Sequence, residues 1–320
     1  MSPFAVVRTG TCDQTYVHDP VIEYERGVYY LFSTGRGISL HTSRDLETWT
    51  RVGRVFEQVP AWTGELIIGS TDHLWAPEIE LLNGKWHLYY SVSTFGKNRS
   101  AIGLATSPTL DPSSPDYKWR DEGVVVQSYA HDDFNAIDPA LASDVDGRLW
   151  LFFGSFWSGI KAVELDEKSG KYLFPNAAPI AIASRPHEFG DAIEAPYVFR
   201  WGQWYYLFVS FDVCCRGIDS TYNIRVGRSK NILGPYIDRE GRPMLEGGGT
   251  LLRAGTQRWR GTGHNSIYMG RAWRKALIVY HAYDAQEKGM SKLRIEDLQW
   301  DAEDWPYLPP VPADDVELTL

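Results

Sequence analysis

Three acidic residues of the sequence lie in short apolar stretches of similar form. Asp19 occurs in VHDPVI, Asp138 in NAIDPAL and Glu194 in DAIEAPYV. Partial burial among apolar neighbours disfavours the charged form of a carboxyl group, so one of the three is expected to keep its proton near neutral pH. A protonated carboxyl beside an ionised one can serve as general acid and general base in one reaction. Cleavage of a glycosidic bond is a reaction that uses such a pair.

The three stretches belong to a repeat that runs through the chain. Four related segments carry a proline at the same place, and these prolines are 57, 62 and 57 residues apart: Pro20, Pro77, Pro139 and Pro196. In a fifth segment Ser266 takes this place. Each segment starts with a residue that we call its lead, polar in most segments. A short apolar run, a turn and a run of alternating aromatic and aliphatic residues follow, and this pattern predicts a β-hairpin.

The predicted turns contain residues that readily adopt positive φ angles. They are Gly27, Asn83-Gly84, Asp146-Gly147 and Gly202. Another strand-like stretch follows each hairpin, for example SAIGLATSPTL after the second. Two hairpins per repeat make a four-stranded antiparallel sheet, so the sequence predicts an all-β, single-domain, five-bladed β-propeller over residues 1–320. The alternative, a pair of packed β-sandwiches, leaves the recurring proline unexplained.

The innermost strand of each propeller blade lines a central channel, so the residues that lead the five hairpins are expected to converge there. These leads are Asp19, Ala76, Asp138, Glu194 or Ala195, and His264. Acidic groups in a narrow channel raise one another's pKa, and a fold gains little stability from collecting them. The sequence therefore predicts a catalytic site at the channel. The alternative is that each acid only caps a turn of its own blade.

Composition narrows the class of ligand. The chain has 32 Lys and Arg against 41 Asp and Glu, a formal net charge of −9, which disfavours nucleic acids and anionic membranes as partners. No apolar run is long enough to span a bilayer. Aromatic residues make up 14% of the chain, and their flat rings suit stacking on sugars as well as core packing. A neutral ligand fits this composition best.

The cysteines and the first residues bear on the compartment. Cys12, Cys214 and Cys215 lack the spacing of a zinc site, and adjacent cysteines can bridge only through a strained eight-membered ring. We therefore expect these cysteines to be structural or free. The start, MSPFAVVRTG, lacks the basic and apolar regions of a signal peptide. A cytoplasmic protein is expected, or a secreted one from which the signal peptide has been removed.

A set of short motifs runs in order through nearly the whole chain: VHDPV, DHLWAPEI, NAIDPAL, GSFWSGIK, IEAPYV, FVSFDVCCRG, GPYIDREGRPMLEGGGT, GTGHNS and VYHAYDA. This set resembles the family-43 glycoside hydrolases, and among them the endo-1,5-α-L-arabinanases. The resemblance implies endo-acting hydrolysis of α-1,5-linked L-arabinofuranosyl bonds in arabinan, with inversion of configuration. It assigns Asp19 as general base and Glu194 as general acid, and it implies that Asp138 modulates the pKa of the acid and orients it.

The same motifs contain candidate substrate contacts. The resemblance implies that Trp75 and Phe134 contact arabinose units, and Trp157 offers a further ring. Core packing is an equally good explanation for either tryptophan. Asn135 and Ser155 are expected to bind sugar hydroxyls, although asparagine also favours turns for its own reasons.

No cofactor is required for the predicted chemistry. The resemblance implies a calcium ion, largely hydrated, in the channel near His264. Histidine is an unusual ligand for calcium, which prefers oxygen, so water or carboxylates would have to complete the shell. A hydrogen bond from His264 to a catalytic carboxylate is the competing role.

Several functions stay open at this point. Within the family they are an exo-acting arabinanase, an α-L-arabinofuranosidase and a β-xylosidase. Outside catalysis they are a lectin-like propeller that binds sugar and a propeller that binds proteins. Three acids at matching blade positions favour catalysis, since binding a neutral sugar needs no protonated carboxyl. The oligomeric state is not predicted.

Overall fold

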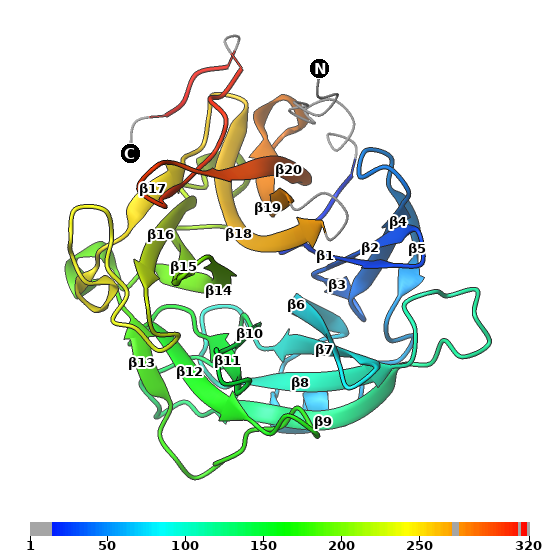
Figure 1. The fold of residues 1–320 in the computed structure, drawn as a ribbon. Coiled ribbons are helices and arrows are strands. Elements are labelled where there is room, and N and C mark those ends of the chain that lie inside the picture. Colours follow the sequence, from blue (N-terminus) through cyan, green and yellow to red (C-terminus); the bar gives the residue numbers. More distant parts are fainter. Residues whose placement is uncertain (1–14, 271–274, 313–314, 319–320) are drawn as a thin grey trace.

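The computed structural model describes residues 15–270, 275–312 and 315–318. These residues form mainly β-structure, arranged as five antiparallel sheets around one axis, with the first strand of each sheet nearest the centre (Figure 1). The predicted five-bladed β-propeller is thus confirmed. No helix in the described ranges has the length and apolar character needed to cross a membrane.

The blades follow one another in chain order. Blade one contains β1 (Val21–Glu25), β2 (Val28–Ser33), β4 (Ser39–Ser43) and β5 (Thr50–Arg54). Blade two contains β6 (His73–Leu82), β7 (Lys85–Val92), β8 (Ser100–Ser107) and β9 (Arg120–Ser128), with the two-residue β3 (Gly35–Arg36) beside β6. Blade three contains β10 (Ala140–Ser143), β11 (Leu149–Phe153), β12 (Ile160–Leu165) and β13 (Ile180–Ala183).

The last two blades have the same order of strands. Blade four contains β14 (Ile193–Trp201), β15 (Trp204–Phe211), β16 (Asn223–Ser229) and β17 (Thr250–Arg253). Blade five contains β18 (Trp259–Gly270), β19 (Lys275–Asp284), β20 (Met290–Trp300) and β21 (Pro306–Tyr307). The helices are short: α1 (Trp62–Leu66) and 3-10 turns at His187–Phe189, Gly217–Asp219, Met244–Glu246 and Ala285–Glu287.

The predicted hairpin turns join the first two strands of blades one to four. Between β6 and β7, for example, Asn83 and Gly84 have φ angles of +51° and +75°, and Leu82 pairs with Lys85. Two successive positive φ angles give a tight turn whose twist matches that of the flanking strands. The corresponding turn of blade five, residues 271–274, lies outside the described residues.

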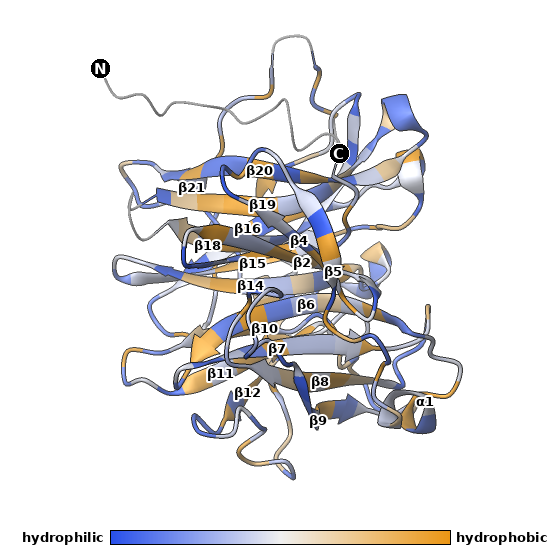
Figure 2. Ribbon diagram, turned by 90° about the vertical axis from the view of Figure 1, so that its right-hand side faces the viewer, coloured by the Kyte–Doolittle hydropathy of each residue, from blue (hydrophilic) through white to orange (hydrophobic). Residues whose placement is uncertain are grey.

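Each blade is apolar on both faces and packs against both neighbours. On β2, Tyr30 and Phe32 belong to a hydrophobic cluster shared with blade two, whereas Tyr29 and Leu31 belong to one shared with blade five. Successive side chains of a strand point to opposite faces, so an aromatic and aliphatic run fills two interfaces at once. Figure 2 shows hydrophobic residues interspersed along the strands. The core therefore lies between the blades.

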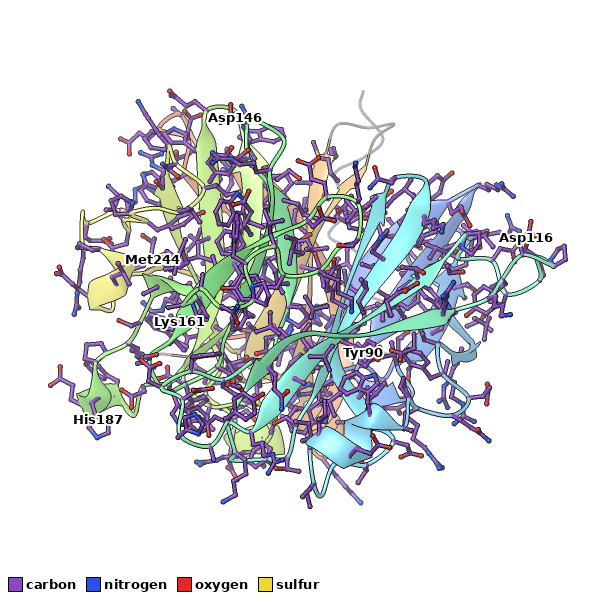
Figure 3. The ribbon with its side chains drawn as sticks, turned by 90° about the horizontal axis from the view of Figure 1, so that it is seen from below. Tyr90, Asp116, Asp146, Lys161, His187 and Met244 are labelled. Carbon is purple, nitrogen blue, oxygen red and sulfur yellow. A yellow bond between two sulfur atoms is a disulfide. The ribbon has the colours of Figure 1, made fainter. Side chains whose placement is uncertain are left out.

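The ring closes between the first residues described and the last blade. The N–H of Val17 donates to the carbonyl of Ser291 at 3.2 Å, and the N–H of Leu293 donates to that of Thr15 at 3.0 Å. Residues from the start of the chain thus pair with β20, which joins blade one to blade five. The longer loops reach outward, as Asp116 and His187 show at the outer edge of the molecule (Figure 3).

Candidate active site

The residue that leads each blade has a left-handed backbone. The φ angle lies between +42° and +60° at Asp19, Ala76, Asp138, Ala195 and His264. Such angles are uncommon outside glycine and persist only where the surroundings fix them. The lead of blade four is therefore Ala195, and Glu194 precedes it by one residue. The sequence alone had left these two alternatives open.

A hydrogen bond to the preceding blade holds most of these leads. The N–H of Ala76 donates to Thr34 Oγ1 (2.7 Å), and that of Asp138 donates to Ser91 Oγ (2.9 Å). The N–H of His264 donates to Ser210 Oγ (2.9 Å), and that of Asp19 donates to His281 Nδ1 (3.1 Å). Blade three pairs Ala140 with Phe152, and the same register continued by two residues puts Gly154, which has no side chain, opposite Asp138. There Oδ2 of Asp138 accepts the N–H of Ala195 at 3.1 Å. This bond fixes Asp138 against blade four.

Asp19 is surrounded by histidines. Its Oδ1 lies 2.7 Å from His18 Nδ1, 3.0 Å from His264 Nδ1 and 3.6 Å from His281 Nδ1. Its Oδ2 accepts a hydrogen bond of 2.5 Å from Thr34 Oγ1. Burial opposes ionisation, but the charges and hydrogen bonds of His18 and His264 outweigh it and hold the pKa of Asp19 well below its usual value. Asp19 is therefore ready to accept a proton as a carboxylate.

The surroundings of Asp138 shift its pKa in the opposite direction to that of Asp19. Burial, together with the nearby charges of Glu194 and Asp19, raises the pKa of Asp138 to about 8, although His264 favours its ionised form. For His264, burial favours the neutral ring, but Asp19, Asp138 and Glu194 outweigh it and raise its pKa to about 9. Near neutral pH the cavity thus contains a carboxylate at Asp19, an imidazolium at His264 and a proton on Asp138.

Glu194 accepts hydrogen bonds on both carboxyl oxygens. Ser155 Oγ donates to Oε2 at 2.7 Å, and the hydroxyl of Tyr222 donates to Oε1 at 2.6 Å. The backbones of Ser155 and Glu194 also form a β-bridge, so the loop after β11 runs directly beside the start of β14. These contacts hold the side chain of Glu194 between blades three and four.

The three acids open into one cavity of about 1140 Å³. Loop segments 93–97, 155–157, 190–191 and 213–217 form part of its wall. Among the residues predicted from the sequence, the structure brings to this cavity Asp19, Trp75, Asn135, Asp138, Ser155, Trp157, Glu194 and His264. The volume is in the range of a site for a ligand larger than a single sugar unit.

Phe134 does not line the cavity. It packs at the edge of the cluster between blades two and three, with its ring 6.0 Å from that of Phe153. The ring of Phe134, expected from the resemblance to contact arabinose, therefore contributes to core packing. Phe95, which sequence reasoning missed, is 78% exposed and lines the cavity. It follows β7 in STFGK, where an aromatic residue just beyond a strand is the only sequence signal.

Other residues of the site were also missed or left without a role. The rings of His18 and His281 stack at 3.8 Å between centroids beside Asp19. His281 takes the place in blade five that Thr34 takes in blade one, so a closer alignment of the repeats would have found it. Tyr222 precedes the third strand of its blade, outside the repeated hairpin, and no pattern marks it.

Cys214 and Cys215 form a disulfide, so of the two roles expected from the sequence this pair has the structural one. The eight-membered ring closes on the β15–β16 loop, where Cys215 has a φ of +66° and its N–H donates to the hydroxyl of Tyr283 at 2.8 Å. Both cysteines line the cavity, and Cys215 Sγ lies 3.8 Å from His18 Nε2. Cys12 lies outside the described residues.

The described residues near His264 and Asp19 offer few oxygen ligands for the predicted calcium ion. In the described part of the chain, potential metal ligands converge in two groups: His18 with Cys214 and Cys215, and His18 with Asp19 and His281. The disulfide removes both thiolates from the first group, and the second offers mainly nitrogen, whereas calcium takes about six to eight oxygen ligands. His264 directs Nδ1 at Asp19, which leaves one nitrogen for an ion. These residues do not form a calcium cage, and we derive no chemical step through a metal.

The fold is a propeller, and its cavity contains acidic residues in opposed charge states. The model of glycosyl hydrolases family 43 matches residues 13–306, and the chain belongs to this family. It is therefore a glycosidase, which sets aside the lectin-like and protein-binding alternatives.

Relatives of known activity cover most of the chain. One, 46% identical over 303 residues (92% of this chain, 87% of the relative), is the extracellular exo-α-(1→5)-L-arabinofuranosidase ArbA of Cellvibrio japonicus. Another, 44% identical over 294 residues (91% and 87%), is the extracellular endo-α-(1→5)-L-arabinanase 1 of Bacillus subtilis. The solved structure of a Cellvibrio cellulosa α-L-arabinanase complexed with arabinohexaose matches with a TM-score of 0.87 and 44% identity, over 92% of this chain and 96% of that one.

These relatives correct the expected compartment. Both curated relatives are named extracellular, which contradicts the expectation of a cytoplasmic protein. That expectation came from the first residues, which lie outside the described part of the chain. The Cys214–Cys215 disulfide agrees with the correction, because disulfides persist mainly in oxidising compartments and are rare in the cytosol.

Proposed function

We propose that the protein hydrolyses α-1,5-linked arabinan as an endo-acting enzyme with inversion of configuration. The observation that carries this proposal is the contrast within one cavity between Asp19, held as a carboxylate, and Asp138, which burial and the neighbouring charge of Glu194 keep protonated. A pair of carboxyl groups with opposed protonation states is what glycoside hydrolysis needs. The names of the relatives supply the substrate class.

Each acid has one role in this mechanism. Asp19 takes a proton from water as the water oxygen attacks the anomeric carbon. Glu194 gives its proton to the glycosidic oxygen as the bond from that oxygen to the anomeric carbon breaks. Asp138 keeps a proton within its pair with Glu194, and the N–H of Ala195 holds it in place. Direct attack by water inverts the configuration, for which base and acid stand roughly 6.5–9.5 Å apart.

The cavity wall offers the contacts that a neutral sugar chain needs. Trp75 and Trp157 present rings for stacking, and Trp157 is 37% exposed. The hydroxyl of Ser155 and the amide of Asn135 are expected to meet sugar hydroxyls. Both already have a protein partner, since Asn135 Oδ1 accepts from Ser100 Oγ at 2.6 Å and Ser155 donates to Glu194.

Product analysis on linear, debranched 1,5-α-L-arabinan tests the proposal. A ladder of arabino-oligosaccharides early in the reaction is expected for endo action. Arabinose or a single short product would instead support exo action, the alternative favoured by the name of the 46% identical relative. Glu194→Ala is the control, and substantial activity in this variant would overturn the assignment of the acid.

The stereochemical proposal has a separate test. NMR spectra recorded during the first turnovers should show a product of inverted anomeric configuration. Retention would overturn direct attack by water and would make Asp19 a nucleophile. The same preparation tests the role of Asp138, because Asp138→Asn should move the alkaline limb of the pH–rate profile.

The calcium ion remains a separate proposal, carried by His264 alone and otherwise by water. Thermal unfolding of chelator-treated protein, with and without added calcium, tests it. A calcium-dependent rise in Tm that is lost in His264→Gln would support an ion at this residue. An unchanged Tm would leave His264 with its contact to Asp19 as its role.

A further inference from the structure

Tyr222 is a buried tyrosine whose hydroxyl meets a carboxyl oxygen of Glu194. It is 1% exposed and donates to Glu194 Oε1 at 2.6 Å. Burial and the charges of Glu194 and Asp138 raise the pKa of Tyr222 well above its usual value, so the hydroxyl keeps its proton. Tyr222 is absent from the cavity wall, which means that it acts on substrate only through Glu194.

Blade five is shaped to admit the ring of Tyr222. A Cβ atom placed on Gly263 would lie 2.1 Å from Cδ1 and 2.4 Å from Cε1 of that ring, far inside contact distance. The ring of His281 lies 6.0 Å away at a tilt of 30°. Gly263 therefore leaves the room that lets a tyrosine of blade four stand against blade five.

The backbone beside Tyr222 is anchored on both sides. The N–H of Thr221 donates to the carbonyl of Val213 at 2.9 Å, and Asn223 Nδ2 donates to Asp212 Oδ2 at 2.7 Å. These bonds tie together the two ends of the β15–β16 loop. The hydroxyl of Tyr222 is thus held by ring packing and backbone together.

The two donors to Glu194 differ in where they lie. Ser155, which donates to Oε2, lines the cavity, whereas Tyr222, which donates to Oε1, does not. Serine and tyrosine hydroxyls can both accept as well as donate, so the type of hydroxyl does not distinguish the two oxygens. Position distinguishes them: Oε2 contacts a residue of the cavity wall and Oε1 does not, so we infer that Oε2 is the oxygen on the cavity side.

We propose that Tyr222 is a positioning residue for the general acid: its hydroxyl fixes Oε1 of Glu194 and leaves Oε2 to protonate the leaving oxygen. This inference rests on the proposed function, in which Glu194 is the acid. A hydrogen bond donated to a carboxylate favours its ionised form. Tyr222 therefore makes the proton of the Asp138–Glu194 pair easier to release as well as better aimed.

The test is Tyr222→Phe, which keeps the ring and removes only the hydroxyl. On linear arabinan we expect kcat to fall about tenfold, with KM within about twofold. The alkaline limb of the pH–rate profile should move about one pH unit upward, because the pair then binds its proton more tightly. The loss of kcat should shrink on an aryl arabino-oligoside, whose leaving group needs little protonation.

A matched control is Tyr236→Phe. Tyr236 is also 1% exposed, and its hydroxyl also makes a 2.6 Å bond, to the carbonyl of Ile232 and not to an acid. We expect its profile to match that of the unaltered protein. A second variant, Gly263→Ala, displaces the ring of Tyr222 and should shift the alkaline limb in the same direction as Tyr222→Phe.

An unmoved alkaline limb in Tyr222→Phe, whatever its rate, would overturn the positioning role. An equal shift in Tyr236→Phe would also overturn it, since the effect would then be general to buried hydroxyls. Failure of the proposed function looks different, because Glu194→Ala would then keep its activity on arabinan or the unaltered protein would release no product.

Discussion

The two sides of the cavity place the same functional group, a carboxyl, in opposite surroundings. On one side, blades one and five surround Asp19 with the rings of His18, His264 and His281. On the other side, blades three and four give Glu194 two hydroxyl donors and the carboxyl of Asp138 as a neighbour. Positive charge keeps Asp19 ionised, whereas burial and like charge keep a proton on Asp138.

The difference shows how a repeated scaffold gives two aspartates of one motif opposite charge states. Asp19 and Asp138 share the lead position and the left-handed backbone, so local geometry does not set their charge states. The blades differ in the side chain that accepts a hydrogen bond from the N–H of the residue leading the following blade. His281 brings an imidazole to Asp19, whereas Gly154 carries no side chain and Oδ2 of Asp138 accepts the N–H of Ala195 instead. Departures from the repeat therefore determine these charge states.

The strongest test of this difference between the two sides is to remove each carboxyl group in turn. Asp19→Ala and Glu194→Ala should each lower kcat on linear arabinan by about 10²–10⁴-fold, because each removes a proton acceptor or donor from the transition state. The two variants should separate on an aryl arabino-oligoside with a good leaving group. Such a substrate does without the acid, so Glu194→Ala should recover activity and Asp19→Ala should not.

Equal behaviour of the two variants on both substrates would contradict the assignment of opposite roles. Circular dichroism and thermal unfolding serve as controls for folding. Exchange of the two results, with Asp19→Ala recovering activity, would assign the acid to blade one.

The next prediction removes charge from the side of Asp19. His264→Gln takes away an imidazolium that favours the ionised forms of both Asp19 and Asp138. Loss of this charge raises the pKa of both carboxyls, so both limbs of the kcat/KM profile should move to higher pH, by about one unit. Activity should therefore fall on the acidic side and persist further on the alkaline side.

His131→Gln is the matched control for His264→Gln, because His131 is a histidine exposed to solvent and is absent from the cavity wall. Its profile should not move. A shift of only the alkaline limb in His264→Gln would contradict the stated effect of this histidine on Asp19.

A smaller effect is expected from the residues that support the leads. Ser91→Ala removes the acceptor for the N–H of Asp138, and Ser210→Ala removes the one for the N–H of His264. Both serines are fully buried, so each change should lower the free energy of unfolding by about 1–3 kcal/mol, measured with urea. Ser91→Ala should also lower kcat a few-fold more than Ser210→Ala, because Asp138 is paired with the acid. An equal kcat in the two variants would count against that pairing.

The repeat explains how much of this could be predicted from sequence. Two-residue alternation and turn residues indicate the hairpins, and the recurring lead brings Asp19, Asp138 and His264 to one place. Contacts made outside the repeat could not be predicted in this way. Tyr222, which lies just before β16, reaches Glu194 because Gly263 of blade five leaves room for its ring.

Aromatic and cysteine positions show the same limit. Phe134 and Phe95 both occur near motif residues, yet one packs in the core and the other lines the cavity, because the path of each loop decides. The disulfide between adjacent cysteines depends on a local left-handed backbone at Cys215 that no spacing rule reveals. Short motifs predict which residue types meet at an axis, but loop paths set the rest of the wall.

The smallest predicted effect concerns that disulfide, which lies on the Asp19 side beside His18. Two sulfur atoms at the wall give an apolar contact surface, and serines would replace it with hydroxyls that prefer water. The double variant Cys214→Ser with Cys215→Ser should raise KM for arabinan about two- to threefold and leave both pH limbs in place, because no titrating group of the acid–base pair is changed. Treatment of the unaltered protein with a reductant should raise KM in the same direction. A moved acidic limb would show instead that the disulfide acts on Asp19 through His18, and the contrast between the two sides would then depend on the redox state of this loop.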